Sequence, residues 1–286
     1  MNEDKTLYLF IGDIFGGILR SKSVVGYFHS IENFIKNTHT FIETDYLQNP
    51  ATASIENGAN LIAGKIQEAC LLNGFQVILV GHGRGALEIL NFIKKYPQLA
   101  DLPQLKKIIF ASPLFGPSYF ATKILKYLSP LMPSQLKKSL IEISNPNLGE
   151  IVKSDWEEIL KLESKKITKK TLEIKTSSKN KSNYPLVLKF LNYKIFNSQG
   201  ENNGVISLDS QQSLKEVEFI HLDSNHIALF GNRTVNKNSQ VSIKEIYHFL
   251  TPIDFIEEGI LSPSYKVNNK QTEQLLSEEF NQSVFE

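Results

Sequence analysis

Residues 77–86, VILVGHGRGA, join a short apolar run to a glycine-rich turn and then to an amphipathic segment. The run at 75–80 is rich in apolar and β-branched residues and ends at glycine, which is typical of a buried strand. The turn GHGRG places three glycines within five residues, and apolar residues at helical spacing follow over 86–93. This stretch therefore predicts a strand, a tight turn and a helix in immediate succession.

Most of the chain alternates between two kinds of apolar pattern. Short runs rich in β-forming residues predict strands at 6–11, 40–44, 107–111, 186–196 and 217–222. Segments with apolar residues at helical spacing predict helices at 24–35, 54–72, 242–250 and 253–260. Such alternation predicts an α/β fold with a mostly parallel central sheet flanked by helices. The stretch 114–183 departs from it, because its pattern indicates helices and loops.

Composition excludes several classes of protein. The 31 basic and 30 acidic side chains leave a net charge of +1, which gives no support for a nucleic-acid binder, although a local charged patch stays possible. A single cysteine, Cys70, excludes an internal disulfide framework. The start of the chain carries two acids, unlike a secretory signal, and the apolar stretch 7–19 is too short and interrupted to span a bilayer. A cytoplasmic protein without a transmembrane segment is expected, and export without a cleaved signal stays open.

The turn at 81–85 resembles the G-H-S-x-G nucleophile elbow of lipases and esterases in the α/β-hydrolase superfamily. Four more segments resemble that family in matching order: GDIFGG at 12–17 (the oxyanion loop), SPLFGP at 112–117 (the turn after the next strand), NNGVI at 202–206 (the triad acid) and DSNHI at 223–227 (the triad histidine). The resemblance covers about 7–249, with Ile11 where the family has a histidine. It implies an α/β-hydrolase fold with a helical, lid-like insertion.

Two of the three catalytic positions depart from the family pattern. The resemblance places Gly83 at the nucleophile, Asn203 at the acid and His226 at the base, and only the histidine is retained. Glycine has no side-chain oxygen with which to form an acyl-enzyme. An amide in place of the acid does not stabilise an imidazolium and favours the wrong imidazole tautomer. The degenerate elbow therefore predicts a pseudoenzyme.

A displaced catalytic site is the alternative. Ser112 follows the next strand and would supply a hydroxyl at the same edge of the sheet. Asp223 and Asp209 are alternative acids for His226. An active esterase of this kind needs a hydroxyl within about 3 Å of a His226 nitrogen.

Backbone donors at this edge do not depend on the missing side chains. The amide of Asp13 or Ile14, together with that of Arg84 at the start of a helix, would form an oxyanion-hole-like site for a carboxylate, ester or acyl group. His82 is expected to pack beside it. The Arg84 side chain either points to solvent or turns inward and adds positive charge. The histidine spacing fits no familiar zinc signature, so neither a metal nor another cofactor is predicted.

The predicted organisation is an α/β-hydrolase-like domain over 1–266, with a helical insertion at about 117–182, and a polar tail over 267–286. Apolar residues at 115–132 either form a cap that binds an acyl chain or partner, or simply pack two helices together. The lysines at 165–181 form a solvated loop face or contact an anionic lipid or acidic partner.

The sequence thus predicts a lipase/esterase-like pseudo-hydrolase that binds a small hydrophobic or acyl ligand or a protein partner. The alternative is an active serine esterase or lipase with a site rebuilt around His226. A third possibility is an interaction protein whose pocket is filled by its own side chains, and the absence of space above Gly83 would indicate it.

Overall fold

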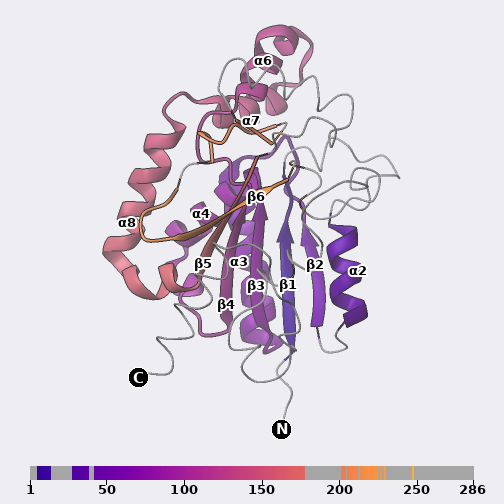
Figure 1. The fold of residues 1–286 in the computed structure, drawn as a ribbon, viewed down its shortest axis with the longest axis vertical. Helices are drawn as coiled ribbons and strands as arrows, with labels where there is room; N and C mark the ends of the chain where they lie inside the picture. Colours follow the sequence, from indigo (N-terminus) through magenta and orange to yellow (C-terminus); the bar gives the residue numbers. More distant parts are fainter. Residues whose placement is uncertain are drawn as a thin grey trace.

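The computed structural model describes residues 5–13, 28–38, 42–177, 201–203, 205–211, 213–224, 226, 229 and 247. Its centre is a six-stranded sheet in the order β2-β1-β3-β4-β5-β6, and every described strand pair is parallel (Figure 1). The strands are β1 (Thr6–Ile11), β2 (Ile42–Leu47), β3 (Gln76–His82), β4 (Leu105–Ala111), β5 (Thr171–Ser177) and β6 (Glu218–Asp223). The predicted α/β fold with a mostly parallel sheet is confirmed.

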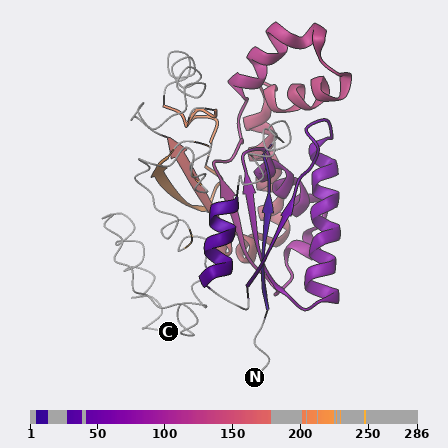
Figure 2. The same cartoon turned by 90° about the vertical axis from the view of Figure 1, so that its right-hand side faces the viewer.

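Helices cover both faces of this sheet (Figure 2). The helices of the described residues are α2 (His29–Thr38), α3 (Ile55–Ile66), which continues as the π-helix η1 (Gln67–Leu72), α4 (Arg84–Lys95), α5 (Pro97–Ala100), α6 (Tyr119–Leu128), the short 3₁₀ turn η2 (Ser129–Leu131), α7 (Ser134–Ser144) and α8 (Leu148–Lys169). The strands read as continuous apolar runs because both faces are buried. In β1, Leu7 and Leu9 pack in a core with α3, α4 and α8, whereas Tyr8 and Phe10 pack in a second core with α2.

One predicted segment is wrong. The sequence pattern indicated helices and loops through 183, whereas 171–177 forms β5 between β4 and β6. The polar residues of β5 break the apolar pattern that is typical of a buried strand, and each of the two charged ones is buried with a hydrogen-bonding partner. Glu173 accepts a hydrogen bond from the backbone of Leu214, and Lys175 donates one to Ser213. The helical part of the predicted insertion therefore ends at Lys169.

Several predictions lie outside the described residues. These are the strand at 186–196, the helix at 242–250 apart from Tyr247, the helix at 253–260, the tail at 267–286 and the oxyanion-loop residue Ile14. Within the described part of the chain, no helix is both long and apolar enough to cross a membrane.

Strand register brings the predicted site residues together. Ile11 of β1 pairs with Gly81 of β3, so Asp13 and Gly83 emerge side by side at the carboxyl edge of the sheet. His82 of β3 pairs with Ala111 of β4, so Ser112 emerges on the other side of Gly83. The site is thus positioned by three neighbouring parallel strands.

Candidate functional site

The turn after β3 is as tight as its glycines predict. Gly83 has φ 56° and ψ −115° and directly precedes α4. A Cβ atom at Gly81 would lie 2.7 Å from the carbonyl oxygen of Gly85, and one at Gly85 would lie 2.5 Å from that of Ile11. Because real Cβ atoms do not approach backbone this closely, only glycine fits these two flanking positions.

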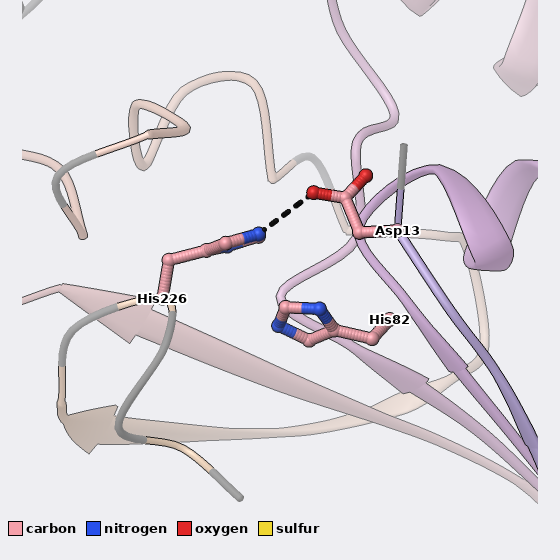
Figure 3. A group of neighbouring side chains, drawn as sticks. All are labelled: Asp13, His82 and His226. Carbon is pink, nitrogen blue, oxygen red and sulfur yellow. Dashed lines mark hydrogen bonds and ion pairs between the residues drawn. The ribbon is translucent and has the colours of Figure 1, made fainter. Parts of the chain in front are cut away.

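The space above Gly83 is filled by Asp13. A Cβ atom at Gly83 would lie 2.6 Å from Asp13 Cγ and 2.8 and 3.0 Å from its two carboxylate oxygens. Oδ1 of Asp13 accepts a hydrogen bond of 3.0 Å from the backbone N–H of Arg84. Oδ2 lies 3.0 Å from Nε2 of His226 (Figure 3). A buried carboxylate, 2% exposed, therefore fills the space above Gly83 and contacts both the backbone N–H of Arg84 and the ring of His226.

Asn203 determines which nitrogen of His226 carries the proton. Oδ1 of Asn203 accepts hydrogen bonds from the backbone N–H groups of Val205 (3.1 Å) and Ile206 (2.9 Å). Its NH₂ group must then face Nδ1 of His226, 3.2 Å away. An NH₂ group only donates, so Nδ1 accepts and the proton resides on Nε2, which donates to Asp13. A general base needs the opposite tautomer, with Nε2 unprotonated.

His82 lies against this pair, as Figure 3 shows. Its ring centroid is 4.1 Å from that of His226, and the side chain is fully buried. Burial lowers the pKa of His82 well below its ordinary value, and the neighbouring His226 lowers it further. His82 is therefore a neutral packing partner at physiological pH.

Asp13, His82 and His226 also bring one possible metal ligand each within 4.8 Å of one another. A metal bound at Nε2 of His226 would require the proton on Nδ1. That proton would point at the NH₂ group of Asn203, so two donors would face each other. The surroundings of His226 therefore do not fit a metal centre.

The alternative catalytic residues lie elsewhere. Ser112 is buried, with φ 44°, and its Oγ lies 2.6 Å from Oγ1 of Thr176. Thr176 in turn accepts a 2.9 Å hydrogen bond from Nδ2 of Asn203, so Ser112 connects to the Nδ1 side of His226 and not to Nε2. Asp209 and Asp223 are exposed, whereas the ring nitrogens of His226 face Asn203 and Asp13.

The Arg84 side chain neither points to solvent nor enters the site. It is buried and forms an ion pair with Glu88 on the next turn of α4, at 3.2 Å. It also donates to Oγ of Ser139 on α7, at 2.7 Å, and to the backbone oxygen of Ala53. Burial raises the pKa of Glu88 to about 7, against the opposing effect of the Arg84 charge. Arg84 therefore links the helix after the elbow to α7.

Sequence reasoning missed the Asp13 carboxylate and Thr176. The sequence-based prediction uses only the backbone amide of Asp13, and Thr176 lies in β5, the strand that was not predicted. A signal for Asp13 did exist, because an acidic residue directly follows β1 at the sheet edge that carries the elbow.

No family model matches this sequence, and no curated protein is similar to it by sequence. Solved structures are similar in fold. A metagenomic carboxyl esterase is 13% identical, with a TM-score of 0.62 over 91% of this chain and 77% of its own. A mature lipase from Bacillus licheniformis is 14% identical, with a TM-score of 0.60 over 88% and 94%. A phospholipase from Legionella pneumophila is 10% identical, with a TM-score of 0.60 over 97% and 62%. The chain has the α/β-hydrolase fold.

Proposed function

We propose that this chain is a catalytically inactive protein of the α/β-hydrolase fold that acts by binding, and that its own Asp13 fills the catalytic centre. One observation carries the proposal. The Asp13 carboxylate lies directly above Gly83, between the backbone N–H of Arg84 and Nε2 of His226. It takes the place of both a nucleophile and a substrate oxygen.

On this proposal, three groups that ester hydrolysis requires are missing or blocked: the nucleophile, a donor for the oxyanion and the general base. Gly83 has no atom that attacks a carbonyl carbon. The amide of Arg84, which would stabilise an oxyanion, already donates to Asp13. His226 holds its proton on Nε2, so it has no lone pair there for activating a hydroxyl or a water. Each loss would block the reaction by itself, so restoring one of them alone leaves the protein inactive.

The filled centre also restricts what the protein binds. A ligand carboxylate or acyl oxygen would have to displace a carboxylate that is tethered in place by the chain. Hydrogen bonds to a charged group contribute about 1.5–3 kcal/mol each, and Asp13 makes two in the interior. A small acyl ligand at the elbow is therefore disfavoured, and we assign the binding function to a surface of the protein away from Gly83.

Hydrolysis of short- and long-chain p-nitrophenyl esters by the purified protein tests the proposal. The unmodified protein and its His226→Ala and Ser112→Ala variants should all remain at the background rate. Turnover by the unmodified protein that is lost in His226→Ala would overturn the proposal. Additional loss in Ser112→Ala would identify the active esterase with a displaced nucleophile.

A further inference from the structure

Large apolar side chains are exposed at the end of the molecule that α6 and α7 form, beyond the carboxyl edge of the sheet (Figures 1 and 2). Tyr127 and Leu128, at the end of α6, are 67% and 48% exposed, and Leu131 of η2 is 84% exposed. Ile141 on α7 is also exposed. Large apolar side chains in water are costly, and several of them at one end of a molecule are typical of a contact surface.

The same region carries unbalanced positive charge. The segment from α6 to α7, residues 119–144, contains four lysines, Lys123, Lys126, Lys137 and Lys138, and one acidic residue, Glu142, which is partly buried and accepts a hydrogen bond from the backbone N–H of Ile55. None of these four forms an ion pair with the described residues, unlike Lys65, Lys94, Lys95 and Lys153 elsewhere on the molecule. Lys126 and Lys123 instead lie over the rings of Tyr127 and Tyr119, at 5.7 and 4.9 Å from the ring centroids. Among the described residues, the ammonium groups at this end therefore have no ion-pair partner.

We propose that this basic apolar tip, residues 119–141, docks the protein on an anionic lipid bilayer. The inference rests on the proposed function, because it names the partner of a surface away from the filled centre. Leucine and tyrosine side chains at the tip would enter the boundary between headgroups and acyl chains. The lysines beside them would remain at the level of the phosphates, because their long stems extend along apolar groups while the ammonium stays hydrated.

Charge complementarity favours a bilayer over a protein partner. The four lysines are distributed over both α6 and α7 and have no fixed acidic counterparts among the described residues. An anionic bilayer supplies continuous negative charge above an apolar interior, which matches lysines around protruding leucines. Each lysine near such a surface contributes about 1 kcal/mol, or roughly a five-fold gain in affinity.

Co-sedimentation of the full-length protein with ether-linked phospholipid vesicles tests this inference. Ether-linked phospholipids lack the carboxylic ester bonds that a lipase cleaves, so binding is measured independently of ester hydrolysis. Phosphatidylcholine vesicles are compared with mixed phosphatidylcholine and phosphatidylserine vesicles at low and high salt. The unmodified protein should bind the mixed vesicles more tightly, and salt should weaken that binding.

Two pairs of substitutions separate the apolar and charged contributions. Lys137→Gln with Lys138→Gln should weaken binding to the mixed vesicles about 30-fold, and Leu128→Ser with Leu131→Ser should weaken it by a tenfold factor or more. All four positions are exposed, so folding should be preserved and is verified by circular dichroism. The matched controls are Leu71→Ser with Leu72→Ser, and Lys161→Gln with Lys215→Gln, which change exposed residues away from the tip.

The results separate failure of this inference from failure of the proposed function. Absence of binding to the mixed vesicles, equal binding to neutral vesicles, or equal losses in tip and control variants would each overturn membrane docking. Ester hydrolysis in the assay described above would overturn the proposed function without altering vesicle binding.

Discussion

Substituting serine for Gly83 should lower the stability of this protein much more than it would in a protein with free space above the turn. The new Cβ atom would lie 2.6 Å from Cγ of Asp13, which forces the carboxylate to move. Forcing extra atoms into a packed interior costs about 1–3 kcal/mol. The left-handed backbone at φ 56° adds about 1–2 kcal/mol for a residue with a side chain. Gly83→Ser should therefore lower the free energy of unfolding by about 2–5 kcal/mol.

The steric part of this cost should disappear when Asp13 is removed. Asp13→Gly alone is destabilising, because it leaves the N–H groups of Arg84 and His226 without the acceptor that they share. In the double variant, the serine hydroxyl at position 83 takes over part of that acceptor role. The double-mutant cycle should therefore show a favourable coupling of about 2 kcal/mol between positions 13 and 83.

Urea unfolding followed by the fluorescence of the single tryptophan, Trp156, measures all four proteins of the cycle. Gly64→Ser is the matched control, because no atom lies within 4 Å of a Cβ atom there and its backbone is helical. Gly83→Ser should be much more destabilising than this control. If the changes at positions 13 and 83 are additive within about 0.5 kcal/mol, the carboxylate does not occupy the space above Gly83.

Two further predictions concern buried charges. Burial raises the pKa of Glu173 from 4.5 to about 7, so the folded protein retains a proton that the unfolded chain loses, and stability falls as pH rises between these values. Between pH 4.5 and pH 8, the free energy of unfolding measured in urea should fall by about 3 kcal/mol less in Glu173→Gln than in the unmodified protein. If the pH dependence of stability is the same in both proteins, protonation of Glu173 does not cause it. Arg84→Met leaves Glu88 buried without its partner and should cost about 3–5 kcal/mol, whereas Arg84→Met with Glu88→Leu should recover most of it. Equal stability of the single and double variants would contradict a buried ion pair.

Local patterns were sufficient to predict the strands of the described sheet other than β5, and the turn after β3. Buried parallel strands such as β1 and β3 are apolar along their whole length, so they are recognisable without knowledge of their neighbours. The glycines at 81 and 85 are required by backbone contacts within a strand–turn–helix unit and to an adjacent strand. β5 was missed because its polar residues are satisfied by partners distant in sequence, such as Leu214 for Glu173.

The chemistry of the site was only partly predictable for a similar reason. The sequence predicts Gly83, Asn203 and His226 as site residues, because each occupies a motif that resembles one in the family. It did not reveal that the Asp13 side chain enters the centre, because the position of a side chain depends on the space that its neighbours leave. The missing side chain at Gly83 creates that space, and Asp13 occupies it. A repair designed from sequence alone, Gly83→Ser with Asn203→Asp, would therefore fail unless Asp13 is shortened as well.

The position of the proton on His226 distinguishes an inactive centre from one that could work as a general base. ¹⁵N NMR of the imidazole ring at neutral pH, assigned with His226→Gln, should show the proton on Nε2 and a lone pair on Nδ1. Asn203→Asp should add a second proton at Nδ1, because both ring nitrogens would then face a carboxylate, the new one at position 203 and that of Asp13 as before. A proton on Nδ1 in the unmodified protein would contradict the account, since His226 would then be in the tautomer of a working general base.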